Sequence, residues 1–259
     1  MLMHMKGHNG KSPCRACRID GILDPRPRST AHYTPLHRHP RTHSYDPLDL
    51  PNRTHDEFMQ HAASVDGAPT DAEADRRATH FGINGTPALA KLSSLKFPAS
   101  FPHDFMHLMF ENVIPELISL WTTDYKGLDT GTEAYHLRDS VWSAIGEACA
   151  ASGDTIPAAF GCRVPNVAKK GTKHTAESRL LFTTLIAPVL LFKRFDNDKY
   201  YKHFIKLVKL INLCLQLELR PGDVASIRSG FAKWVKDFER SVLPLKQYLR
   251  ASNLILFEL

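Results

Sequence analysis

The second half of the chain carries apolar residues at steps of three and four positions, which is the period of an α-helix with one buried face. The first such stretch follows Pro98 and Pro102, which disfavour helix and hold the chain extended. Its apolar positions are Phe105, Leu108, Met109, Val113, Leu117 and Leu120. Pro115 falls inside this stretch, so we expect it to kink or divide the helix.

Similar patterns predict further helices over about 134–152 and 176–194, from Asn197 up to Pro221-Gly222, and from Asp223 onward. Thr175 and Asp223 are candidate N-caps. Strand signals are few, with short extended pieces expected near 1–6 and 32–36. We therefore predict a mostly α fold.

Residues 38–80 have a different composition, rich in Pro, Arg, Asp, Thr and His, without a sustained hydrophobic period. A segment of this kind buries too little apolar surface to order itself, so we predict a flexible linker. The expected organisation is a knuckle segment over 1–37, the linker over 38–80 and a helical region over 81–259.

The formal net charge is +6 at pH 7, which favours contact with phosphate-rich partners such as DNA. Many of the basic residues fall on the last two predicted helices, namely Lys202, Lys206, Lys209, Arg228, Lys233, Lys236 and Arg240. The alternative interpretation of these residues is a solvated polar face without a nucleic-acid role.

We expect neither a membrane span nor secretion. The longest apolar run, Leu180 to Phe192, is too short to cross a bilayer and contains Pro188. No secretory signal follows Met1, and the five cysteines are odd in number. An intracellular protein with reduced thiols is the expectation.

Cys14 and Cys17 form a Cys-x-x-Cys knuckle, the spacing that presents two thiolates to one zinc ion. His103 and His107 are four positions apart, and Asp104 precedes His107 by three, so a helix would place these groups on one face. We predict that the two cysteines, one histidine and either the other histidine or Asp104 form a closed, structural zinc site.

Two other interpretations of the knuckle stay open. The cysteines could be reduced thiols in a turn, or a redox pair, although no thioredoxin-like βαβ pattern surrounds them. His8 and His4 are weaker ligand candidates than the histidines near residue 105.

Glu111 lies one helical turn beyond His107. A carboxylate near a metal-binding helix start is a candidate catalytic group. The alternative is a surface glutamate of an amphipathic helix.

Several segments, in this order, resemble the transposases of CACTA-type (En/Spm-like) DNA transposons, especially the fungal branch. The similar segments are Met5-Lys6-Gly7-His8-Asn9-Gly10, Cys14-Arg15-Ala16-Cys17, Tyr33-Thr34-Pro35-Leu36, Gly82-Ile83-Asn84-Gly85, Phe97 to His107, Glu111-Asn112-Val113, Ile156-Pro157, Phe160-Gly161 and Tyr200-Tyr201-Lys202-His203. The resemblance covers most of the chain up to about residue 240.

The resemblance implies an RNase H-like catalytic domain in which two aspartates and a glutamate hold two Mg²⁺ ions for DNA cleavage and strand transfer. It implies that Cys14, Cys17, Asp104 and His107 are signature positions of an insertion in that domain. Glu111 matches a recurrent position of the family. A nuclear location and DNA as the partner follow from the same resemblance.

The sequence departs from this family where the catalytic aspartates should lie, because both are expected upstream of the segment that contains Met1. We therefore expect a helical remnant of a DDE-type transposase that is inactive alone. The alternatives are a non-catalytic, zinc-stabilised DNA-binding module and a helical interaction protein.

Overall fold

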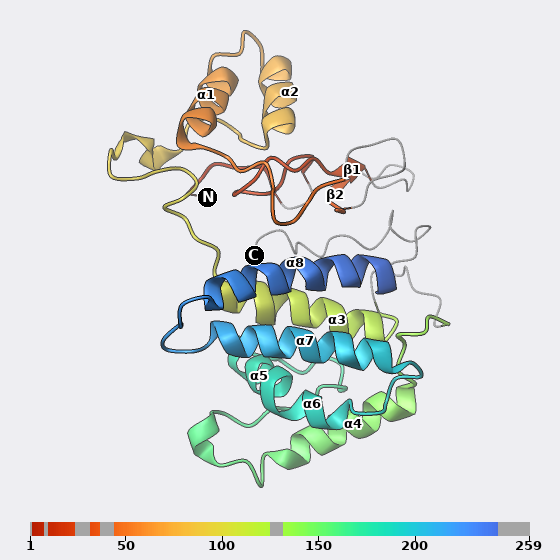
Figure 1. Cartoon of the computed structure of the whole chain (residues 1–259). Coiled ribbons are helices and arrows are strands. Elements are labelled where there is room, and N and C mark those ends of the chain that lie inside the picture. The colour runs from red at the N-terminus through yellow and green to blue at the C-terminus, as the bar shows by residue number, and fades with distance from the viewer. Residues whose placement is uncertain (1, 8–9, 24–31, 37–43, 125–131, 243–259) are drawn as a thin grey trace. The chain divides into compact units, whose positions relative to one another are not determined.

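The computed structural model describes residues 2–7, 10–23, 32–36, 44–124 and 132–242. These residues are mostly helical, as the sequence predicts (Figure 1). The chain divides into two compact units, and the second runs from Asp104 to Val242. The described part of the first unit ends at His103. The division therefore falls after the proline-containing segment, within the region from residue 81 onward that is predicted to be helical.

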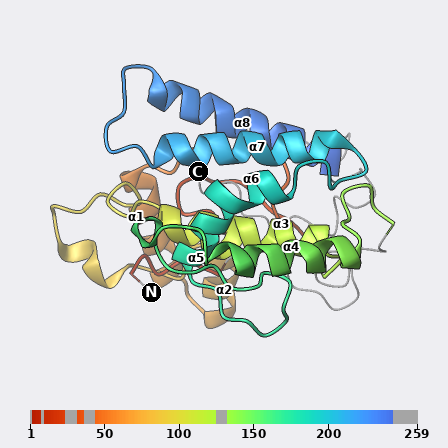
Figure 2. The ribbon, with the colours of Figure 1, turned by 90° about the horizontal axis from the view of Figure 1, so that it is seen from below.

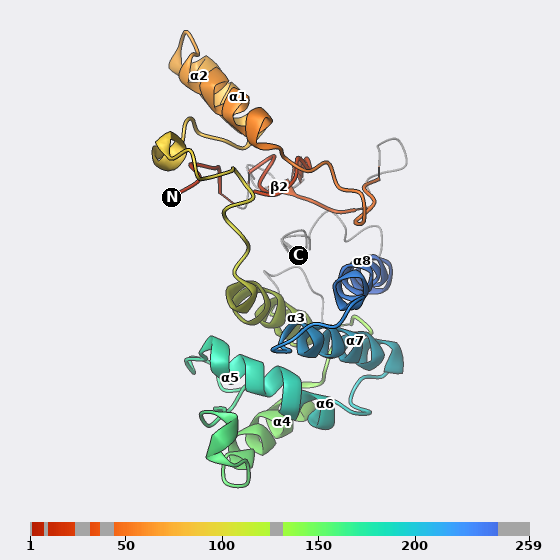
Figure 3. The same ribbon diagram turned by 60° about the vertical axis from the view of Figure 1, so that its left-hand side comes forward.

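The described part of the first unit contains short strands, two α-helices and a 3-10 turn. These are β1 (Ile22–Leu23), β2 (His32–Tyr33), α1 (His55–Asp66), α2 (Asp71–Phe81) and η1 (Ala88–Lys91). β1 and β2 pair antiparallel, with Ile22 opposite Tyr33. Helices α1 and α2 lie side by side, as Figure 1 shows, and one lies in front of the other in the view of Figure 3.

The prediction of a flexible linker over 38–80 is wrong for α1 and α2. Each helix begins at a threonine cap, because the hydroxyl of Thr54 accepts from the Glu57 N–H and that of Thr70 accepts from the Glu73 N–H. Glu57 also accepts from the Thr54 N–H, which completes a capping box. Helix α1 then buries Phe58, Ala62 and Val65 at helical spacing. Residues 38–43 lie outside the described residues.

The N-terminal segment runs antiparallel to the chain that follows α2. Met5 forms an isolated bridge with Ile83, and the Lys6 N–H donates to the Gly82 carbonyl at 2.9 Å. The Asn84 N–H donates to the His4 carbonyl at 2.7 Å. Within the segment 1–6, where an extended piece is expected, Met5 thus pairs with a part of the sequence that is nearly eighty positions away, whereas Leu2 and Met3 form a turn.

A small apolar core lies beneath this pairing. Met3, Met5, Ile83 and Phe97 are buried against Phe58 of α1. The rings of Phe58 and Phe97 stack at 5.4 Å between centroids. The N-terminal segment and the chain that follows α2 are thereby packed against the first helix.

The second unit is all helical within its described residues (Figure 2). Its elements are η2 (His107–Val113), α3 (Ile114–Trp121), α4 (Asp139–Ser152), η3 (Ala158–Phe160), α5 (Ala176–Leu181), η4 (Phe182–Ile186), α6 (Ala187–Leu190), α7 (Asp198–Cys214) and α8 (Asp223–Val242). Here η2 and η4 are π-helical and η3 is a 3-10 turn. The candidate caps Thr175 and Asp223 lie at the starts of α5 and α8.

The helix that contains Pro115 does not break at the proline, and a π-helical stretch ends two residues before it. The helix begins at Phe105 and passes through the π-helical η2 directly into α3. Proline has no N–H to donate, so one backbone carbonyl of the preceding turn lacks its usual helical partner at Pro115. Arg179 of α5 donates to the Phe110 carbonyl at 3.1 Å, so the widened turn has a polar partner on a neighbouring helix.

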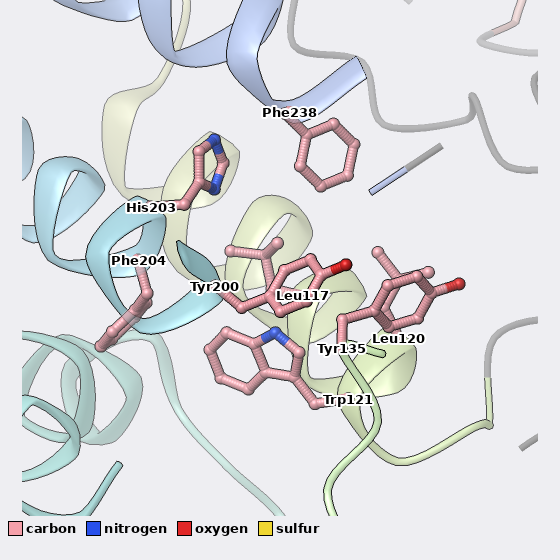
Figure 4. Close-up of a pocket in the computed structure, with 8 residues that line it drawn as sticks. All are labelled: Leu117, Leu120, Trp121, Tyr135, Tyr200, His203, Phe204 and Phe238. Carbon is pink, nitrogen blue, oxygen red and sulfur yellow. The ribbon is translucent and has the colours of Figure 1, made fainter. Parts of the chain in front are cut away.

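Helices α7 and α8 form an antiparallel pair, because Tyr200 contacts Ser241 whereas Leu210 lies against Gly230. The edge of Trp121 in α3 packs on Phe204 of α7, with ring centroids 5.3 Å apart. A cavity of about 10 Å³ remains at this junction, which is room for one water molecule at most. Figure 4 shows its lining residues from α3, α7, α8 and Tyr135.

Candidate functional site

Cys14 and Cys17 lie together as the knuckle spacing predicts. Their sulfur atoms are 3.1 Å apart, and the Cys17 N–H donates to the Cys14 sulfur at 3.3 Å. The Cys17 thiol donates to Cys14, and this bond together with burial raises the pKa of Cys17. Two thiolates on one tetrahedral zinc ion are about 3.8 Å apart, so the pair would separate by about 0.7 Å on binding. The two residues therefore fit one half of a zinc site.

Arg53 holds the carbonyl groups of this turn. Its Nε donates to the carbonyls of Cys14 at 3.1 Å and Cys17 at 3.2 Å, and its Nη2 donates to the Ser12 hydroxyl at 2.9 Å. The residue is only 6% exposed. Burial lowers the pKa of Arg53, whereas the neighbouring cysteines act in the opposite direction. A buried guanidinium here favours the thiolate forms that a metal ion requires.

Backbone pairing sets the position of Arg53. The Arg53 N–H donates to the Ala16 carbonyl and the Arg18 N–H donates to the Pro51 carbonyl, both at 2.8 Å. Thr54, the next residue, caps α1. Sequence reasoning missed Arg53, because a single arginine in a segment rich in arginine carries no distinguishing signal.

The other predicted zinc ligands lie around the boundary between the units. Asp104 accepts the His107 N–H at 3.1 Å and so caps the helix that begins at Phe105. His103 comes before the first helical residue, so helical spacing does not place it beside His107. His8 lies outside the described residues.

His107 pairs with Glu111 one turn along the same helix. The distance from His107 Nδ1 to Glu111 Oε2 is 2.7 Å, and both side chains are exposed. In the part of the chain that the structure describes, no three His, Cys, Asp or Glu side chains are close enough to hold one metal ion. The four-ligand zinc site and the catalytic role of Glu111 therefore stay predictions.

A second candidate site is the basic face of α7 and α8. Lys199, Lys202, Lys206 and Lys209 follow each other at steps of three and four, and all are exposed. This spacing places them along one face of α7. Lys233 and Arg240 of α8 approach the same face through Asp237, which lies 3.2 Å from the Lys206 ammonium.

His203 and Trp234 join α7 to α8 directly beneath this basic face. His203 Nε2 bonds the Trp234 carbonyl at 3.0 Å, and Trp234 Nε1 donates to the His203 carbonyl at the same distance. Their rings stack with centroids 4.5 Å apart. Burial lowers the pKa of His203 to about 4, so the neutral imidazole donates from Nε2 at neutral pH. The helical period of apolar residues from Asp223 onward predicted α8. It did not predict the reciprocal bonds between His203 and Trp234, because these residues are 31 positions apart.

No helix in the described residues is long and apolar enough to cross a membrane. Comparison with protein-family models, with curated proteins and with solved structures gave no match to the chain. The similarity to CACTA-type transposases therefore rests on the sequence motifs alone.

Proposed function

We propose that this chain is a transposase-related, DNA-binding polypeptide that contacts phosphate groups through the basic face of α7 and α8. The observation that carries the proposal is the row of four exposed lysines on one face of α7. Lys233 and Arg240 extend this row onto the adjacent helix.

The row has a length that suits a nucleic-acid backbone. Lys209 lies ten positions after Lys199, which corresponds to about 15 Å along a helix axis. Phosphates of one DNA strand advance about 3.4 Å per nucleotide, so the row can follow several of them. Lys202 pairs with Asp198 at 2.7 Å, but both side chains are exposed, and an exposed pair contributes little and exchanges readily for phosphate contacts.

In the same proposal, Cys14 and Cys17 hold a zinc ion that stabilises the knuckle of the first unit. Asp104, His107 and His103 are the proposed sources of the remaining ligands, in line with the transposase resemblance. A closed four-ligand ion has a structural role, because no coordination position is left for a substrate. The catalytic Mg²⁺ chemistry belongs to the intact family and is not part of this proposal.

Binding of a labelled duplex at a series of salt concentrations tests the DNA proposal. We expect log K to fall linearly with log salt, because bound lysines displace counterions from the phosphates. The double variant Lys202→Ala/Lys209→Ala should reduce this slope by about 2.

The matched control is Lys91→Ala/Lys96→Ala, which removes two exposed lysines of the first unit. This control should leave the slope close to that of the unchanged protein. A flat salt response of the unchanged protein, or equal effects of the two double variants, would contradict the proposal.

A further inference from the structure

One carboxylate lies at the meeting point of three cations on the basic face. Arg240 Nη2 is 2.7 Å from Asp237 Oδ1, and the ammonium groups of Lys206 and Lys233 are 3.2 and 3.4 Å from Oδ2. Lys206 comes from α7, whereas Lys233, Asp237 and Arg240 come from α8. Three positive charges against one negative charge leave a local excess of two positive charges.

The carboxylate and the cations differ in their exposure. The side chain of Asp237 is 12% exposed, whereas those of Lys206, Lys233 and Arg240 are 52%, 69% and 76% exposed. A lysine ammonium has three N–H donors and a guanidinium has five. Each cation that makes one bond to Asp237 therefore has most of its N–H groups directed elsewhere than at this carboxylate. These cationic groups are therefore accessible from solvent above a mostly buried anion.

We propose that Asp237 is a positioning residue, which gathers Lys206, Lys233 and Arg240 into one cluster that binds a single phosphate group of a nucleic-acid backbone. This inference rests on the proposed function of the basic face. Long side chains lose conformational freedom when they are fixed by a ligand, and this loss weakens binding. Asp237 orders the three side chains before the phosphate arrives, so less freedom is lost on binding.

A positioning role for Asp237 and simple charge repulsion by Asp237 predict opposite changes in DNA affinity when this carboxylate is neutralised. If Asp237 only repelled DNA, its neutralisation would strengthen binding. If it positions the cations, its neutralisation weakens binding even though the net positive charge increases. The sign of the change therefore separates the two explanations.

The experiment compares Asp237→Asn with Asp198→Asn by duplex binding across a salt series. Both variants remove one negative charge from a carboxylate that pairs with a lysine of α7. Asp198 is the matched control, because it is half exposed and its pairing with Lys202 lies outside the cluster. We expect Asp198→Asn to bind as tightly as the unchanged protein or more tightly. Asp237→Asn should bind about threefold more weakly, with a salt slope smaller by about 1.

The salt slope distinguishes a positioning role from a purely structural one, which would change the melting temperature and not the slope. Should Asp237→Asn fail to fold, Lys233→Ala/Arg240→Ala provides the second test, because both side chains are exposed. This pair should weaken binding more than Lys199→Ala/Lys209→Ala.

Each outcome has one meaning. Equal affinity and slope of the two asparagine variants, or equal effects of the two alanine pairs, overturn the positioning role while DNA binding by the basic face stands. An unchanged protein that binds no duplex overturns the proposed function and this inference together.

Discussion

His203 shows how one buried polar side chain can join two helices. Its ring stacks on Trp234, and the two residues exchange hydrogen bonds between side chain and backbone. The charged form of the imidazole is disfavoured by burial, while the nearby Asp237 and the Trp234 carbonyl only partly offset that effect. The same contact that stabilises the α7–α8 pair therefore makes the pair sensitive to acid.

We predict that the second unit loses stability as the pH falls from about 6.5 towards 4. The folded-state pKa of about 4 lies below the ordinary value of 6.5, so the unfolded chain binds the proton more readily in this range. The contribution of His203 is complete above pH 6.5, and about 3 kcal/mol of it is lost by pH 4. Urea unfolding at several pH values measures this loss.

His203→Gln removes the titrating group and should flatten this part of the pH profile. His80→Gln is the control, because His80 is exposed, lies in the first unit and belongs to no proposed site. Parallel profiles for the unchanged protein and His203→Gln would show that the imidazole does not govern the acid sensitivity.

At the scale of elements, helix ends in the first unit join segments that are distant in sequence. Gly82 ends α2 in the left-handed conformation with φ of 74°. It also lies against the backbone of Ser12, where an added Cβ would be 1.9 Å from the Ser12 oxygen. The end of α2 thus contacts the segment that leads into Cys14. A glycine after a helix predicts a left-handed cap. No local pattern predicts that Gly82 also lies against the backbone of Ser12.

Gly82→Ala should destabilise the first unit by about 3 kcal/mol, because a strained backbone and a backbone clash act together. Gly171→Ala isolates the contribution of backbone strain, because Gly171 has φ of 79° and no atom lies within 4 Å of an added Cβ. We expect that control to lose about 1 kcal/mol. Thermal or urea unfolding measures both, and similar losses for the two variants would disprove the close approach.

On the scale of the whole molecule, the proposed zinc site draws on two parts of the sequence, the Cys14–Cys17 turn and the segment from His103 to His107. Each half has its own local support. Arg53 holds the turn that contains Cys14 and Cys17, and Asp104 caps the helix that carries His107.

Metal analysis of the purified chain should find one zinc ion per molecule, lost in Cys14→Ser, Cys17→Ser and His107→Ala. Cys162→Ser and His80→Ala are the controls and should retain it, because both residues are exposed and neither belongs to the proposed set. Zinc should also be released as the pH falls, since protons compete for the thiolates. An unchanged protein without zinc would remove the site. Zinc retained by His107→Ala would exclude that histidine as a ligand.

The helices of the second unit could be predicted from the sequence, because helical period depends on residues three and four positions apart. Thr175 predicted the start of α5, and the apolar patterns from Asn197 and from Asp223 predicted the starts of α7 and α8 to within a few residues. Helices α1 and α2 were missed because their composition outweighed two local signals, the caps Thr54 and Thr70.

Local patterns in the sequence by itself determined the helical class, the Cys14–Cys17 knuckle and the row of lysines on α7. Tertiary structure alone decided that Arg53 contacts the knuckle, that Met5 pairs with Ile83 and that Asp237 meets Lys206. The physical reason is the range of the interactions. A helix face is specified by neighbours within one or two turns, whereas a partner more than thirty positions away is chosen by how the whole chain packs.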